Sequence, residues 1–124
     1  MNEYNDEDSI LVSIKHCLGI DRENFDFHDF DIDLILHINS IFSILYQLGV
    51  KKNGYFINGP GQTWSDYLSG YEDVLNDVKS YMLIRVRLLF DPPASASVLN
   101  QMKEYAEELE WRIQVGAENH NQGV

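Results

Sequence analysis

Apolar residues recur every three or four positions in several stretches of the chain, and this spacing places them on one side of an α-helix. The pattern is densest between Asp77 and Asp91, where it covers most of the helix circumference. The apolar positions there are Val78, Tyr81, Met82, Ile84, Val86, Leu88 and Leu89. Pro92 and Pro93 cannot continue the helical hydrogen bonds. The pattern predicts a central, largely buried helix that begins near residues 71–73 and ends at Asp91.

Three further helices are predicted to pack around the central one, over residues 9–18, 31–48 and 97–115. The first two are each followed by a glycine, Gly19 and Gly49, which suits a helix C-terminus. In the last helix, five apolar residues spaced three or four apart form a seam for one partner helix. These residues are Leu99, Met102, Ala106, Leu109 and Ile113.

The segment KKNGYFINGPGQT, residues 51–63, has a different character. Strand-forming residues precede the turn sequence Asn-Gly-Pro-Gly, and residues 62–64 can return as a second short strand. The segment therefore predicts a β-hairpin, which should lean on the helices or pair with a neighbouring chain. A helical turn over residues 64–69, stopped by Gly70, is expected to follow.

Together these patterns predict a mainly α fold, a small bundle of about four helices with one short β-hairpin. We expect residues 1–8 to form a flexible acidic N-terminus and residues 9–118 a single helical domain. The polar residues 119–124 are expected to form a disordered tail.

The charge balance narrows the possible functions. Twenty acidic and nine basic residues give a formal net charge of -11, which disfavours binding to nucleic-acid phosphates. The one cysteine, Cys17, excludes an internal disulfide and a cysteine-based zinc site, and we expect it to be buried as a small apolar residue. The apolar runs are too short to cross a membrane, and the acidic start does not resemble a signal peptide. The expectation is a soluble protein made in a reducing cytoplasm.

Carboxylates supply the candidate chemistry of this chain. Residues 20–33 alternate acids with phenylalanines but lack the glycine and the oxygen spacing of a calcium loop, so we interpret them as an acidic loop held by aromatic anchors. Glu104 with Glu108, and Asp73 with Asp77, have the one-turn spacing with which all-helical nucleotide pyrophosphatases hold magnesium. An acidic protein produces such pairs by chance. Without a nucleophile, a metal cage or a cofactor fingerprint, we expect no enzyme, metal or cofactor.

Two side chains do not fit a simple bundle. Arg85 projects from the apolar stripe of the central helix, so we expect a buried ion pair with Glu104 or Glu108, or else a contact between subunits. Trp111 is off the seam of the last helix, among acidic residues. Such an aromatic residue is either an anchor for another protein or a cover for the rim of the core.

Several stretches together resemble the head-to-tail connector proteins of long-tailed bacteriophages and their prophages. The stretches are DLILHINSIFSILYQLGV, GYFI followed by QTWSDYL, VKSYMLIRVRLLFDPPASASVLNQM, and ELEWRIQVGAE, and the resemblance covers residues 10–118. It implies a virion structural protein in the neck between head and tail, present in the host cytoplasm during assembly. About twelve copies would form a closed ring beneath the portal. The other end of the ring would meet the stopper or tail-completion protein, and DNA would pass through the hole.

The resemblance also implies contact surfaces on this chain. Portal contacts would lie on the last helix, at Trp111, Arg112, Val115 and Glu118. Contacts to a neighbouring subunit or to the tail side would lie on the expected hairpin, at Tyr55, Phe56, Ile57, Asn58 and Gln62. An electronegative channel wall would let DNA slide without specific binding.

Two other functions stay open from the sequence. An acidic DNA mimic that blocks a host DNA-binding protein would also be small and strongly negative, and would be a monomer or dimer. A helical pyrophosphatase would hydrolyse nucleotides with magnesium and would lose activity on Glu104→Gln.

Overall fold

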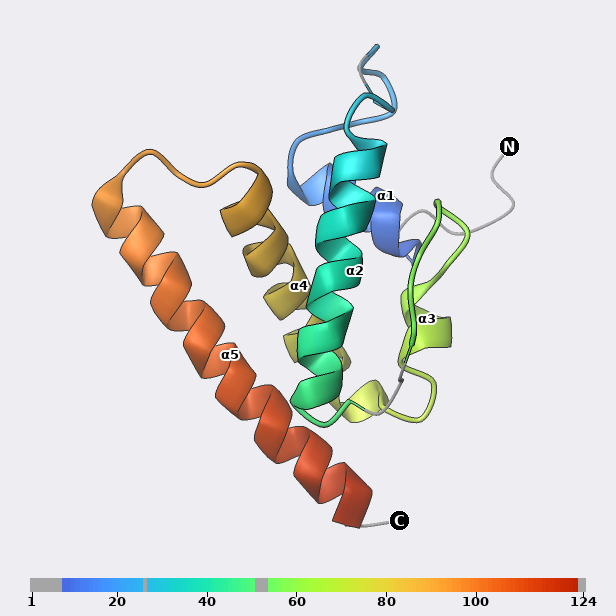
Figure 1. Ribbon diagram of the computed structural model, residues 1–124, viewed down its shortest axis with the longest axis vertical. Helices are drawn as coiled ribbons and strands as arrows, with labels where there is room; N and C mark the ends of the chain where they lie inside the picture. Colours follow the sequence, from blue (N-terminus) through green and yellow to red (C-terminus); the bar gives the residue numbers. More distant parts are fainter. Residues whose placement is uncertain (1–7, 26, 51–53, 123–124) are drawn as a thin grey trace.

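The computed structural model describes residues 8–25, 27–50 and 54–122, which are mainly helical (Figure 1). The elements in chain order are α1 (Ile10–Cys17), α2 (Asp31–Gln47), α3 (Trp64–Tyr67), the 3-10 helix η1 (Glu72–Val74), α4 (Leu75–Phe90) and α5 (Ala96–Gln122). These confirm the four helices that the sequence pattern predicts, and also the short helical turn before Gly70.

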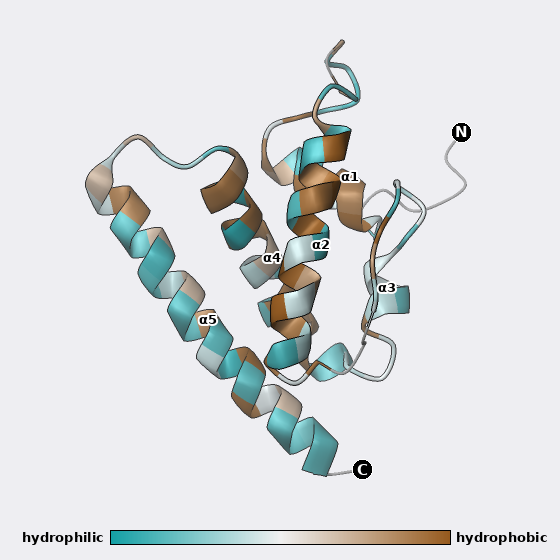
Figure 2. Ribbon diagram, viewed as in Figure 1, coloured by the Kyte–Doolittle hydropathy of each residue, from teal (hydrophilic) through white to brown (hydrophobic). Residues whose placement is uncertain are grey.

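Helix α4 is the central element, in contact with both α2 and α5 (Figure 1). Val78, Met82 and Val86 are fully buried. The helix ends at Phe90, one residue before the predicted end, and the non-helical Asp91 leads into the two prolines. The last turn departs from the prediction, because the Leu89 side chain is 54% exposed. Figure 2 shows apolar residues concentrated on α1, α2 and α4, whereas α5 is largely polar.

Helix α5 packs on α4 through the predicted seam and continues further than expected. The buried residues are Ala106, Leu109, Ile113 and Ala117, while Leu99 and Met102 are partly exposed. The disordered tail predicted for residues 119–124 is wrong for residues 119–122, which are helical. Tyr71 donates a hydrogen bond to the Asn121 side chain at 3.0 Å, and Asn121 donates one to the Gly49 carbonyl at 3.3 Å. These contacts order the last turn. Residues 123–124 lie outside the described residues.

The beginning of the described chain is attached to the middle of the sequence. Ser9 caps α1 by accepting a hydrogen bond from the Val12 amide, and its hydroxyl donates to the Pro60 carbonyl at 2.8 Å. The carbonyl of Asp8 accepts from the Trp64 amide at 2.8 Å. Residue 8, the last one of the predicted flexible N-terminus, is therefore held in place, and residues 1–7 lie outside the described residues.

The predicted hairpin is wrong, since the described residues contain no β-strand. A lone antiparallel bridge joins Ser9 to Thr63. The physical reason is the side chain of Asn39 on α2, which accepts from the Ile57 amide at 2.8 Å and donates to the Ile57 carbonyl at 3.0 Å. A side chain thus takes the place of a partner strand. The predicted hairpin residues 51–53 lie outside the described residues.

Two local predictions around α1 also need correction. Cys17 is exposed rather than buried, because it borders an open pocket between α1, α3 and α4 instead of packing into the core. Of the three predicted aromatic anchors, Phe27 is buried, but Phe30 is partly exposed and Phe25 is fully exposed. Lys15 is buried beside Phe27, a position that its charge gives no reason to expect.

Candidate functional site

A hydrogen-bonded triad fixes the crossing of α4 and α5. Arg85 Nη2 lies 2.9 Å from Glu110 Oε2, and Arg85 Nε donates to the Tyr81 hydroxyl at 3.1 Å. The Tyr81 hydroxyl in turn donates to Glu110 Oε2 at 2.7 Å. Burial, and next the hydrogen bond to Glu110, raise the pKa of Tyr81 to about 12. The ion pair predicted for Arg85 therefore exists within one chain and is partly exposed, but its partner is Glu110 rather than Glu104 or Glu108.

Two adjoining hollows border this crossing, one on each side of Arg85 and Leu88. The first, about 350 Å³, lies between α4 and α5 and is also lined by Lys103, Ala106, Glu107 and Glu110. The second, about 200 Å³, lies between α2 and α4 and is also lined by Ser40, Ile41, Ile44 and Leu89. Figure 1 shows α5 diverging from α4 toward the N-terminal end of α5. At this end Leu89 of α4 and Val98 of α5 are exposed.

The outer side of α5 carries the residues expected to contact a portal. Trp111 is 65% exposed, and Arg112, Val115 and Glu118 are also exposed. Trp111, Val115 and Glu118 are four and then three residues apart, so they share one stripe of the helix. Buried residues such as Ile113 occupy the opposite side of the helix. The stripe is therefore available for contact without disturbing the core.

A comparison with known protein families identifies the family of this chain. A family model described as phage connector protein matches residues 10–120. The chain belongs to the phage connector protein family. No curated protein and no solved structure matches it. The resemblance derived from the sequence stretches is thereby confirmed, and the coarse role of the chain is that of a structural connector in a bacteriophage.

The connector's loop from Gly54 to Gln62 divides into residues that hold it and residues that it presents. Ile57 is buried, and the Tyr55 ring packs against Phe42 and Tyr67 while its hydroxyl donates to Asp66 at 3.1 Å. Desolvation by burial, and next the hydrogen bond to Asp66, raise the pKa of Tyr55.

The other expected contact residues of this loop are at its surface. The Phe56 side chain is 60% exposed and Asn58 is exposed, whereas Gln62 is partly buried. Asn58 and Gln62 exchange two hydrogen bonds, of 3.0 and 2.9 Å. Of the five expected contact residues, Phe56 and Asn58 present the most accessible surface.

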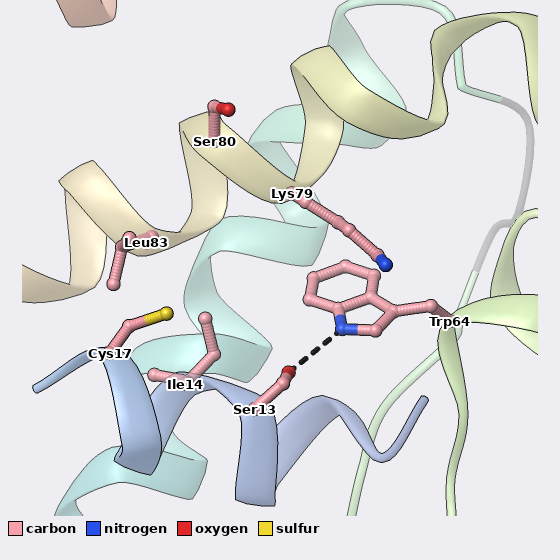
Figure 3. A pocket seen from close by; sticks show the side chains of 7 residues that line it. All are labelled: Ser13, Ile14, Cys17, Trp64, Lys79, Ser80 and Leu83. Atoms are coloured by element: carbon pink, nitrogen blue, oxygen red, sulfur yellow. Dashed lines mark hydrogen bonds between the residues drawn. The ribbon is translucent and has the colours of Figure 1, made fainter. Parts of the chain in front are cut away.

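A further pocket of about 260 Å³ lies between α1, α3 and α4 of the connector (Figure 3). It is lined by Ser13, Ile14, Cys17, Trp64, Lys79 and Leu83, with Ser80 at its edge. The Trp64 indole donates to the Ser13 hydroxyl at 2.9 Å, which fixes the ring as one wall. We call this hollow the Trp64 pocket. Sequence reasoning missed it because its walls come from three separate segments.

The two acid pairs considered for magnesium lie on different elements of the structure. Glu104 and Glu108 lie on the exposed side of α5, while Asp73 is in η1 and Asp77 is in the first turn of α4. Among the described residues, no three His, Cys, Asp or Glu side chains gather closely enough to hold a metal ion. Within the same part of the chain, no helix has the length and apolar character needed to cross a membrane.

Proposed function

We propose that this connector forms a closed ring beneath the portal, joins the capsid to the tail and lines the channel for DNA. The observation that carries the proposal is the set of large apolar side chains left uncovered on separate elements of the chain. They are Ile32 and Leu36 on α2, Leu89 on α4, Trp111 on α5 and Phe56 on the loop. A ring subunit needs two different surfaces for its neighbours and further surfaces for the assemblies above and below.

The portal would contact the stripe of Trp111, Val115 and Glu118, with Arg112 beside it. A large exposed aromatic residue is the usual centre of a binding surface, because its burial removes much apolar area from water. Arg112 lies 3.3 Å from Glu108, so it already has a carboxylate partner on its own helix. The aromatic ring of Trp111, rather than this charge, would supply most of the affinity.

The loop would face a neighbouring subunit or the tail-completion protein. Asn39 holds the loop at Ile57, and Tyr55 fixes it against the bundle. Phe56 and Asn58 are then presented on a support that needs little ordering when a partner binds. The role of this loop would be that of a fixed contact rather than a paired strand.

The channel wall would be formed by the acidic surface of the ring. The net charge of -11 for each chain, repeated around a ring, repels phosphates and favours sliding of DNA over binding. DNA would therefore pass through the ring without sequence-specific contacts.

The test combines electron microscopy with a binding measurement. We expect an added ring of density when purified portal is mixed with the connector, and a similar ring in virions. Trp111→Ala should weaken portal binding by about tenfold or more, because a central aromatic anchor is lost. Tyr105→Ala is the matched control, since Tyr105 is an exposed aromatic residue elsewhere on α5, and it should bind like the wild type.

Two results would count against the proposal. Absence of a ring in both the portal mixture and the virion would refute the function itself. Unchanged portal affinity of Trp111→Ala, in a variant with the wild-type circular dichroism spectrum, would refute the assigned portal surface.

A further inference from the structure

The Phe25 segment, residues 20–25 and 27–30, packs on the protein through Phe27, whereas the Phe25 side chain is fully exposed. Lys15 Nζ lies 2.6 Å from Asp31 Oδ1 and 3.5 Å from the centre of the Phe27 ring, and the Lys15 side chain is 1% exposed. Phe27 is buried by these contacts, whereas Phe25 is 101% exposed and therefore packs against nothing in its own chain. Figure 1 shows the segment extending past the N-terminal end of α2.

An aromatic side chain in this position is unusual for an isolated molecule. Transfer of a phenylalanine ring from water to an apolar site is strongly favourable, and a loop that holds it in water gains nothing for folding. The contacts of Lys15 with Phe27 and Asp31 fix the base of the segment from which Phe25 extends. The arrangement fits a contact that another molecule completes.

The Trp64 pocket has the complementary properties. Ile14 and Trp64 are nearly fully buried and form an apolar floor, and Leu83 borders them (Figure 3). The Lys79 ammonium lies 5.9 Å from the centre of the Trp64 ring, at the edge of the pocket. Within the described part of the chain, no carboxylate lies within ion-pair distance of Lys79. The pocket is therefore an apolar cavity, and the positive charge of Lys79 at its edge has no ion-pair partner among the described residues.

We propose that Phe25 of one copy inserts into the Trp64 pocket of the next copy around the ring. The inference rests on the proposed ring and names one contact between its subunits. Asp21, Glu23 and Asp29 flank Phe25 and are exposed, so their charge complements Lys79 of the receiving copy. The full exposure of Phe25 shows that it does not fill the pocket of its own chain.

The two partners of this contact are different surfaces, which is what a ring requires. The Phe25 segment lies between α1 and α2, whereas the pocket is formed by α1, α3 and α4. A contact between non-identical surfaces repeats from copy to copy and closes when the rotation allows it. Each subunit would then give one phenylalanine and receive one.

The test uses Cys17, which lies in the pocket and is turned toward its interior (Figure 3). A tagged wild-type chain is mixed with an untagged chain that carries Cys17→Ser and Asn24→Cys, and both are assembled on purified portal. Asn24 is exposed, so its replacement leaves Phe25 in place beside the new thiol. A short bismaleimide linker is then added. We expect a covalent product of one tagged and one untagged chain, with residue 17 joined to residue 24 in peptide mass spectrometry.

The control replaces Asn24→Cys by Gln101→Cys, an exposed position on α5, and should give no such product. If electron microscopy shows rings and the product between residues 17 and 24 is missing, the inference is overturned while the proposed function stands. If the wild-type chain forms no ring on the portal or in virions, the proposed function fails, and the inference fails with it.

A second arm measures the strength of the contact. Phe25→Ser should keep the wild-type melting temperature, since the side chain makes no contact in its own chain, yet weaken ring formation by about tenfold or more. Lys79→Glu should weaken it as well, and Glu23→Lys in the same chain should restore part of the loss. Ring formation by Phe25→Ser at wild-type concentrations would also overturn the inference.

Discussion

The two ends of the α4–α5 pair differ in how they are closed. At the C-terminal end of α5, Ile113 and Ala117 are buried and Asn121 hydrogen-bonds to residues before α4. At the other end the helices diverge, and Leu89 and Val98 are exposed. The same helix pair therefore stabilises the fold at one end and leaves apolar surface exposed at the other.

The largest expected effect lies at the buried seam. Leu109→Ala removes a fully buried side chain and should lower the free energy of unfolding by about 2–5 kcal/mol. Leu99→Ala, at the open end of the same seam, should cost well under half as much, because Leu99 is already partly exposed. Urea unfolding of both variants measures the difference. Equal losses would show that the two ends contribute alike, which contradicts the comparison.

A smaller effect is expected at the last turn of α5. Asn121→Ala removes the acceptor of the Tyr71 hydroxyl and the donor to the Gly49 carbonyl, and should cost about 1–2 kcal/mol of stability. Gln122→Ala, at the exposed neighbouring position, is the control and should be neutral. Thermal unfolding measures both. A neutral Asn121→Ala would mean that the last turn does not contribute to closing this end.

The last effect depends on pH and concerns the triad between the two ends. The unfolded chain ionises tyrosine near pH 10, whereas the pKa of Tyr81 in the folded chain is about 12. The stability from this hydroxyl is therefore complete below pH 10 and is lost as the pH rises through 12.

The check is the free energy of unfolding measured in steps across this pH range. Tyr81→Phe should show a shallower fall in stability between pH 10 and 12 than the wild type, and Glu110→Gln should lie between them. An unchanged slope in Tyr81→Phe would show that the triad does not contribute to this pH dependence.

The sequence predicts the helices well because each one has a clear apolar period. In addition, a glycine or proline marks the ends of α1, α2 and α4. Pro92 and Pro93 end α4, and the seam residues of α5 fall where the pattern places them. The register of the crossing cannot be predicted in the same way. Glu104 and Glu108 have plausible spacing for Arg85, yet α5 diverges from α4, and Glu110 is the acid within reach. Partner choice depends on a crossing angle that no local pattern contains.

Two failed predictions and the unexpected burial of Lys15 share one physical cause, which is a side chain whose partner is distant in the sequence. Residues 55–57 favour a strand, but Asn39 takes the hydrogen bonds that a strand would need. Residues 119–122 are polar enough for a tail, yet Asn121 finds partners in two other segments. Lys15 can be buried because its ammonium group forms an ion pair with Asp31 and lies over the Phe27 ring. Asp31 lies sixteen positions from Lys15, and Ile57 lies eighteen from Asn39. The partners of Asn121 lie fifty and seventy-two positions away.

The candidate site was predictable only where it depends on one helix. The exposure of Trp111 follows from its position off the seam, so the sequence alone places it at the surface. The Trp64 pocket is formed by residues of α1, α3 and α4 together. Which phenylalanine of the Phe25 segment is buried depends on the contact of Phe27 with Lys15. Such surfaces can be identified only after tertiary contacts are known.

The attachment of Asp8 and Ser9 to residues 60–64 also sets an order for synthesis. The first helix gains these hydrogen-bond partners only after Trp64 has left the ribosome, and Gly49 gains its partner only after Asn121 has done so. Contacts of such long range delay folding relative to translation. A nascent chain therefore lacks its finished surface until residue 121 has been synthesised.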